Sequence, residues 1–486
     1  MNINVLPHEI LSSILEAAVA INAKEGVTYT YGLSQAPLPA QKAKLNRYLR
    51  GPVCPDDLLW DATASIRQVC SRWHDWALSH SLKQLWVRRW RGSERWAELS
   101  MRRQLYDVYE LIEKPSGYHV YRDPFGSLKH TEELFAAFPN LAKHARRLWF
   151  NGFYTASTDR LILSVLRSCR KLTSVSIPWA LLRHGTADEW AHLLGVAVPE
   201  DPALQTLELQ AIDLSAVQER DYNELTITKP LLDPRVDFSN IKRLKLVGDT
   251  TWMPITDVDL IAMACTATNL EELLVTNMST VTIEGVMALI KASQSSIRII
   301  EHSPLSNDGF FRPHPGVTAS GEHICETLTQ SPKLRDLSIS VPSACECLFA
   351  HEDVAWEGEC QVRASALCGT PCERPNSAET QRARAAALRD MLDRGRSLIS
   401  GRARQRRALD IEFFFAECIF DLRDCVVHGD FALAEISSGG RWPLLKTSSP
   451  KGPYGTTGLY GKDEGTWDII SEAEFFTAVE KGWLRI

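Results

Sequence analysis

The 486-residue chain lacks the features that mark exported and membrane-embedded proteins. No window approaches the roughly 18 consecutive apolar residues of a membrane-spanning helix. The first ten residues, MNINVLPHEI, contain no basic start followed by an apolar run, so we expect no secretory signal. The 12 cysteines are scattered along the chain, which favours reduced thiols. These absences predict a cytoplasmic or nuclear protein with no membrane partner.

An excess of charge of one sign is also missing. The 54 basic and 60 acidic residues give a formal net charge of -6, which argues against a general nucleic-acid binder. A composition of 44% hydrophobic and 23% charged residues is typical of an ordinary folded chain. At this length a single compact core is not expected, so the chain should form two or three domains or one repeat array.

Recognisable catalytic motifs are absent as well. The chain contains no H-E-x-x-H metal pair, no G-x-S-x-G nucleophile turn and no dinucleotide fingerprint. The segment KGPYGTTGLYGKD resembles a phosphate-binding loop only superficially, because five residues separate Gly455 from Gly461 and Asp463 stands where Ser or Thr is needed. The sequence therefore offers no coherent catalytic constellation and no cofactor is predicted, although the absence of a motif is weak evidence because folding can bring distant catalytic residues together.

Two polar features allow more than one interpretation. Five cysteines fall close to His351, and Cys368 and Cys372 have the spacing of a zinc knuckle, but unpaired thiols under a loop are favoured and no metal site is predicted. An arginine-rich segment, 381–410, would suit nuclear import or an anionic partner, but the solvated face of a helix with a few ion pairs is favoured. The cysteines are Cys345, Cys347, Cys360, Cys368 and Cys372.

The segment LPHEILSSILEAAV, 6–19, predicts an amphipathic helix. Pro7 suits a first turn, and Glu9 lies where negative charge is favourable. Prolines and glycines then mark 22–55 as a long loop or insertion. The apolar stripe of the helix consists of Ile10, Leu11, Ile14, Leu15 and Ala18.

A second helical pattern begins at Ile66 and is rich in tryptophan. Its apolar residues recur with the period of one helix that buries one face, and a shorter apolar cluster of Leu82, Leu85 and Trp86 follows. Together with the first helix, this pattern predicts a small helical domain. The residues of the buried face are Ile66, Val69, Cys70, Trp73, Trp76 and Ala77.

From about residue 140 the pattern changes to short strands of the form L-x-x-L-x-L, spaced by about 30 residues, and short amphipathic helices precede several of them. This unit is the leucine-rich-repeat pattern, which predicts a curved solenoid. An unrelated α/β domain with similar strands is the alternative. The copies are LTSVSI (172–177), LQTLEL (204–209), IKRLKL (241–246), LEELLV (270–275), IRIIEH (297–302) and LRDLSI (334–339), with RRLWF (146–150) as a degenerate first copy.

The N-terminal patterns, taken in order, resemble an F-box. That family begins with L-P-x-E-[IL], continues with D-L-L and V-C-x-x-W, and closes with L-W. The matching residues are Leu6 to Leu11, Ile14 with Leu15, Pro55 to Leu59, Ile66 to Trp73, and Leu85 with Trp86. The present chain departs from the family in spacing, because about 30 residues intervene after Val19, as in many fungal F-box proteins.

The resemblance implies a substrate-recognition subunit of an SCF-type ubiquitin ligase, a receptor without catalytic residues. Its F-box would bind the Skp adaptor, and through it a cullin-RING ligase, while the repeats would bind an unknown protein substrate. The alternatives are a scaffold that binds the adaptor without ubiquitination, and an enzyme with an unrecognised site after residue 345. The adaptor-binding residues carried over are Leu6, Pro7, Ile10, Leu11, Val69, Trp73, Leu85 and Trp86.

The predicted fold class is α/β: a three-helix F-box, an irregular leucine-rich-repeat solenoid and a C-terminal mixed α/β extension. The predicted domains are the F-box at 1–96 with an insertion at about 20–54, a helical linker at 97–139, the solenoid at 140–345, and an extension at 346–486 that holds the cysteine-containing loop and the basic segment.

Overall fold

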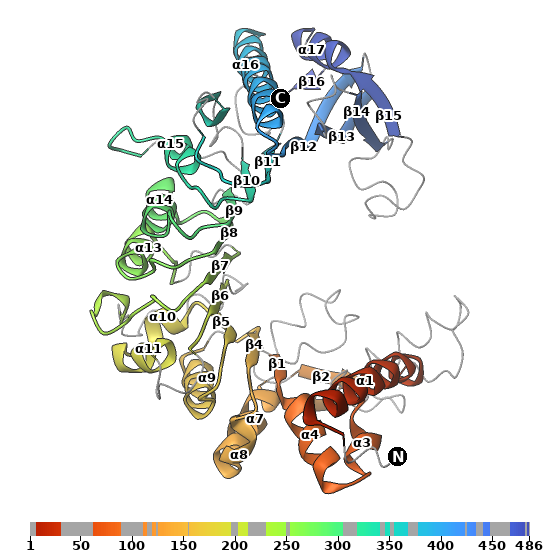
Figure 1. Cartoon of the computed structure of the whole chain (residues 1–486), viewed down its shortest axis with the longest axis vertical. Helices are drawn as coiled ribbons and strands as arrows, with labels where there is room; N and C mark the ends of the chain where they lie inside the picture. Colours follow the sequence, from red (N-terminus) through yellow and green to blue (C-terminus); the bar gives the residue numbers. More distant parts are fainter. Residues whose placement is uncertain are drawn as a thin grey trace. The chain divides into compact units, whose positions relative to one another are not determined.

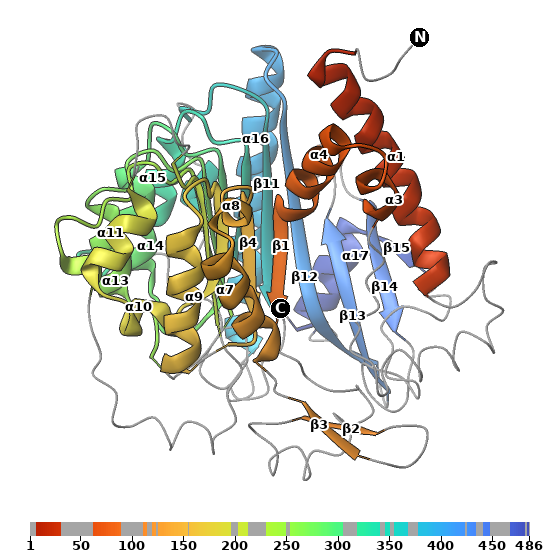
Figure 2. The same cartoon turned by 90° about the horizontal axis from the view of Figure 1, so that it is seen from below.

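The structure is a computed structural model, and it divides into two compact units, Met1–Leu204 and Gln205–Ile486. Both units are α/β (Figures 1 and 2). The boundary between them lies inside the predicted solenoid segment 140–345. The described residues are 6–30, 62–88, 110–113, 119–122, 125–153, 155–195, 203–211, 230–248, 253–304, 318–340, 346–349, 354–367, 378–422, 425–433, 441–447, 467–481 and 484–485.

The first unit begins with helices and continues with alternating helices and strands. Three of its strands, β1, β4 and β5, are parallel neighbours. Strands β2 and β3 form a separate antiparallel pair. The elements are α1 (His8–Thr30), α3 (Ala64–Arg67), α4 (Ser71–Leu82), β1 (Gln84–Arg88), β2 (Glu110–Glu113), β3 (His119–Arg122), α7 (Gly126–Ala137), α8 (Pro139–Ala142), β4 (Arg147–Asn151), α9 (Ala156–Ser168), β5 (Ser174–Pro178), α10 (Leu181–His184) and α11 (Ala187–Leu194).

The core of this unit lies between its strands and α7 and α9. Phe135 of α7, Phe150 of β4 and Ile162 of α9 are all buried. Helix α9 begins at a capping box, in which the side chains and backbone N–H groups of Thr155 and Thr158 bond reciprocally. The start of α9 is therefore set locally, and its apolar face is covered by the strands and α7.

The second unit contains one sheet that changes from parallel to antiparallel. Strands β6 to β12 are parallel neighbours in chain order, β12 to β15 are antiparallel, and β16 pairs with β12. The elements are β6 (Thr206–Gln210), η3 (Pro230–Leu232), β7 (Arg243–Val247), α13 (Asp257–Ala264), β8 (Glu272–Met278), α14 (Ile283–Ala292), β9 (Ile299–Pro304), α15 (Ile324–Thr329), β10 (Asp336–Ser340), η4 (Glu346–Phe349), β11 (Cys360–Leu367), α16 (Ala378–Arg404), β12 (Leu409–Leu422), β13 (Cys425–Leu433), β14 (Arg441–Thr447), β15 (Trp467–Ser471), α17 (Glu472–Glu480) and β16 (Leu484–Arg485).

Each full copy of L-x-x-L-x-L forms a strand that starts two residues after the copy begins. The first apolar residue of a copy, such as Leu270, is buried in the turn before the strand, and the next two alternate positions are buried within it. In β7, Leu244 and Leu246 are buried while Arg243 is exposed. Helices α13, α14 and α15 lie on one side of β7 to β10 (Figure 1), so one face of these strands is covered. The other face carries mostly charged and polar residues, with the apolar Val247, Leu274 and Ile299 among them.

The structure therefore shows the α/β class and a parallel sheet. A parallel sheet does not by itself establish a leucine-rich-repeat solenoid, and the arrangement of an F-box followed by a solenoid stays a prediction. The four predicted domain boundaries stay predictions as well.

Two helix predictions near the N-terminus are wrong in detail. Helix α1 does not end near Val19 but continues to Thr30, so part of the predicted insertion is helical. Asn22 contributes to this extension, because its side-chain amide donates to the carbonyl of Ala62, 2.9 Å away, a contact that periodicity does not reveal. The predicted single helix from Ile66 is two helices, because the backbone of Cys70 is extended and forms the N-cap of α4.

Two other segments contain strands that the sequence did not indicate. The predicted helical linker 97–139 includes the pair β2 and β3, whose β-branched and aromatic residues favour a strand, before α7 begins. The predicted cysteine-containing loop includes β11, which is paired on its two edges with β10 and β12. Of the predicted cysteine loop, Cys345, His351, Cys368 and Cys372 lie outside the described residues, as do 31–61 with Asp57 to Leu59 and the glycine-rich segment.

Candidate partner-binding surface

Helix α1 has two apolar faces, and only one of them is buried by the described residues. At about 100° per residue, Ile10, Ile14 and Ile21 fall within about 40° of one another, and Leu11 and Leu15 lie roughly 100° further round the helix. Leu11 and Leu15 are each 1% exposed, whereas the three isoleucines are 51%, 41% and 58% exposed. The exposed residue Ala17 continues the outer stripe.

The inner face of α1 packs against α3 and α4. Leu11, Leu15, Ile66 and Ala77 form a buried cluster. Around it pack the partly buried side chains of Leu6, Ala18, Val19, Trp73 and Trp76. The apolar contacts of this face therefore come from segments about 50 residues apart in the chain.

Polar contacts fix the same docking of α1. The Trp76 indole N–H donates to the Ser12 hydroxyl, 2.9 Å away, and the Arg72 guanidinium donates to the Leu6 carbonyl at 3.2 Å. The first turn of α1 is closed by the backbone N–H of Leu11, which donates to the Pro7 carbonyl. These contacts hold the outer stripe as a defined surface, because they prevent α1 from rotating about its axis.

The structure separates the predicted adaptor-binding residues of the first helix into three groups. Ile10 and Pro7 are exposed, Leu6 is half-buried, and Leu11 lies in the core. Leu11 is therefore a packing residue of the helical module. The sequence stripe merged Leu11 and Ile10 because neighbouring residues on a helix both fall within a broad apolar face.

The other predicted residues follow α3. Val69, in the turn between α3 and α4, is 55% exposed, and Trp73 is partly buried against the core cluster. Leu85 and Trp86 lie in β1, not in a helix. Trp86 is 69% exposed and stacks on Trp149 with ring centroids 6.0 Å apart, since β1 and β4 place the two residues in register.

A buried acid–histidine pair in the first unit was not found from the sequence. Asp159 and His184 are both buried, with Oδ2 and Nδ1 2.5 Å apart. Burial is the largest influence on the pKa of Asp159 and raises it, while the histidine opposes this. The pair joins α9 to α10 inside the unit and lines neither of the hollows described here, so we assign it to packing.

Metal and thiol chemistry is not supported in the described part of the chain. No group of three or more potential ligands converges among those residues. Cys360 is buried in β11, where desolvation raises the pKa of its thiol to about 12, and burial does the same to Cys169. Both thiols are therefore poor nucleophiles at neutral pH.

The arginine-rich segment forms α16, and its charges are largely engaged. Arg396 forms an ion pair with Glu472 of α17, and Arg389 pairs with Glu480 at 2.6 Å while lying over the ring of Phe476. Arg402 is buried and donates to the carbonyls of Trp356 and Gly358. Only part of the predicted solvated face is therefore solvated, and α16 acts as a packing element of the second unit.

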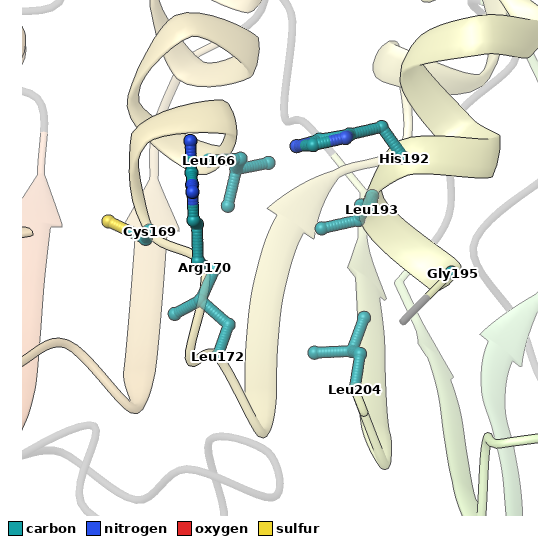
Figure 3. A pocket seen from close by; sticks show the side chains of 8 residues that line it. All are labelled: Leu166, Cys169, Arg170, Leu172, His192, Leu193, Gly195 and Leu204. Carbon is teal, nitrogen blue, oxygen red and sulfur yellow. The ribbon is translucent and has the colours of Figure 1, made fainter. Parts of the chain in front are cut away.

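Two hollows lie on the first unit beside the end of α9. The smaller has a volume of about 30 Å³, and Figure 3 shows Arg170 and His192 extending toward it from the end of α9 and from α11, with Leu172 and Leu204 below. The larger, of about 460 Å³, is also bordered by Arg170.

In comparisons with known proteins, no family model and no curated protein matches the chain. Among the described helices, none is long and apolar enough to cross a membrane.

Proposed function

We propose that the chain is a substrate-recognition subunit of an SCF-type ubiquitin ligase, and that its N-terminal helices bind the Skp adaptor. The observation that carries the proposal is the outer stripe of α1, formed by Ile10, Ile14, Ala17 and Ile21. Burying one large aliphatic side chain contributes about 1.5–3 kcal/mol, so three exposed isoleucines on one face leave a substantial gain for a partner.

The proposal is supported further by the position of the other exposed apolar residues. Val69 and Trp86 are two further residues on which the F-box resemblance rests, and both are more than half exposed. The outer stripe is held in place by contacts on the opposite side of α1, so a partner would meet a preformed surface and lose little conformational entropy on binding.

The polar face of the second unit supports the proposed binding of a substrate. The face of β6 to β8 that carries no helix presents charged and polar residues, among them the ion pairs Arg243–Glu272 and Lys245–Glu208. Such side chains select a partner by electrostatic complementarity. In the proposed mechanism the chain performs no bond chemistry, and it accelerates ubiquitin transfer by holding a substrate lysine near the conjugating enzyme.

The test is co-purification of the full chain with the Skp adaptor. Changing Ile10 and Ile14 together to Glu should lower adaptor recovery by more than about tenfold, since two side chains that the adaptor would bury would become charged. The matched control changes Val258 and Ile261 of α13 to Glu, because these are 52% and 46% exposed and also lie one turn apart. Changing Leu6 and Pro7 together to Ala should weaken recovery less.

Undiminished recovery of the adaptor with a folded Ile10→Glu, Ile14→Glu chain would contradict the proposal. The scaffold alternative is tested in the same experiment by probing for the cullin and for ubiquitin transfer to a co-purified protein. Adaptor binding without cullin would favour the scaffold.

A further inference from the structure

The larger hollow of the first unit combines an apolar wall with several positive charges. Phe135, Ala136 and Pro139, from the end of α7 and the start of α8, form its apolar part. Lys143, Arg167 and Arg170 supply the cations, and none of the described residues that line the hollow is acidic. A volume of about 460 Å³ falls within the roughly 300–1,000 Å³ of small-ligand sites.

Two of the three cations have no acidic partner among the described residues. Arg167 pairs with Glu189 of α11 at 3.0 Å, whereas Lys143 and Arg170 form no ion pair with the described part of the chain. Arg146 lies nearby, and its guanidinium donates to the carbonyls of Lys143, Ala145 and Lys171. Positive charge therefore accumulates at this place.

The excess of positive charge contributes to a lowered pKa of the neighbouring His144 side chain. The pKa of His144 lies below its usual value, first because of burial and then because Lys143, Arg146 and Lys171 repel its protonated form. Basic residues after α8 and α9 also complement the negative ends of these helices. One cation at the C-terminal end of each helix would be enough to complement its dipole. The further basic residues at this place are not explained by the helix dipoles.

Exposed apolar side chains accompany this charge. Phe138 is 57% exposed, and it stands in the chain between the lining residues Ala136 and Pro139. Leu134, on the last turn of α7, is 41% exposed. Arg170 also borders the smaller hollow with His192 (Figure 3), so the basic surface extends from α8 across the end of α9 to α11.

We propose that this surface, formed by Pro139, Lys143, Arg167 and Arg170, binds an acidic segment of a partner protein that carries an apolar side chain among its carboxylates. Charge complementarity selects the acidic segment, and the hollow beside Phe135 and Pro139 accepts the apolar side chain. This inference does not depend on the proposed ligase function, because the surface lies outside the adaptor-binding residues.

The test uses a fluorescein-labelled synthetic peptide of alternating Asp and Glu with one central Phe, and fluorescence anisotropy with the full chain at low salt. We expect saturable binding that weakens as salt is raised. The double variant Lys143→Glu, Arg170→Glu should weaken binding at least about tenfold, and replacing the peptide's Phe by Ser should weaken it severalfold. The matched control is Lys333→Glu, Arg335→Glu, since both residues are exposed in the second unit.

Circular dichroism and thermal unfolding of each variant separate lost binding from lost folding. Equal binding by the double variant and the wild type would overturn the proposal. So would a wild-type chain that binds a basic peptide equally well, prefers a DNA or RNA duplex, or binds inorganic phosphate but not the peptide. A variant that no longer recovers the adaptor should still bind the acidic peptide. The adaptor proposal and the peptide proposal can therefore be contradicted independently of each other.

Discussion

Helices α1 and α14 carry similar apolar side chains and bury them differently. In α14, Ile283, Val286, Met287, Leu289 and Ile290 are all buried. In α1, two large apolar residues are buried and three isoleucines are exposed. The difference arises because α14 contacts both α13 and α15, whereas the outer stripe of α1 has no cover among the described residues. Helix α14 is thus covered by its neighbouring helices, whereas the described residues leave one face of α1 exposed.

The largest difference is expected between shortened side chains on the two faces of α1. Leu15→Ala should lower the free energy of unfolding by about 2–5 kcal/mol, because it leaves a cavity in the buried cluster. Ile14→Ala, on the outer stripe, should change it by no more than about 0.5 kcal/mol. Urea unfolding followed by tryptophan fluorescence measures both. Equal losses would mean that the outer stripe is covered after all.

A smaller effect is expected from adding atoms to each helix. A methyl group at Gly285 of α14 would lie 2.6 Å from the Asp257 carboxylate and 3.1 Å from the Leu260 side chain. Gly285→Ala should therefore cost about 1–3 kcal/mol of stability despite the better helix propensity of Ala.

The counterpart on α1 is Ala17→Leu, which adds a larger group to the exposed stripe. We expect it to leave stability nearly unchanged. Thermal unfolding of the two variants provides the measurement. A stable Gly285→Ala chain would show that α14 is packed less closely than its contacts indicate.

The smallest effect concerns an exposed polar contact. Hydrogen bonds from Arg235 lower the pKa of Asp233 to about 2 from its usual 3.8. A folded-state pKa below the unfolded value means that the stabilisation is fully present above pH 4 and is lost as the pH falls toward about 2. Because Asp233 is solvent-exposed, Arg235→Gln should change the acid dependence of unfolding only slightly. A large loss of stability at neutral pH would contradict this.

The strands were predictable because their pattern is local. Alternate apolar residues mark a buried face wherever they occur, so each L-x-x-L-x-L copy located its strand to within two residues. Strand β11 was missed although Cys360, Val362, Ala364 and Ala366 alternate with polar residues. Two of these four residues are alanines, so the apolar signal is weak, and the strand is paired on both edges by β10 and β12.

The candidate surface was predictable in part. The F-box resemblance predicted Ile10, Val69, Trp86 and Leu11 as adaptor-binding residues. The first three are exposed in the structure, whereas Leu11 is buried. Cysteine and arginine counts were poor guides, because Cys360 and Arg402 are buried side chains whose surroundings come from distant segments. The basic hollow was missed because its lining residues, from Phe135 to Arg170, share no motif.

Local patterns in the sequence were enough to predict the α/β class, strands β4 to β10 and an amphipathic helix after Pro7, because hydrogen bonding and apolar periodicity within an element depend on neighbouring residues. Only the tertiary structure decided which stripe of α1 is buried, that Cys70 separates two helices, and that Leu85 and Trp86 belong to a strand paired with β4. These outcomes depend on segments far away in the chain, whose packing and hydrogen bonds outweigh local preference.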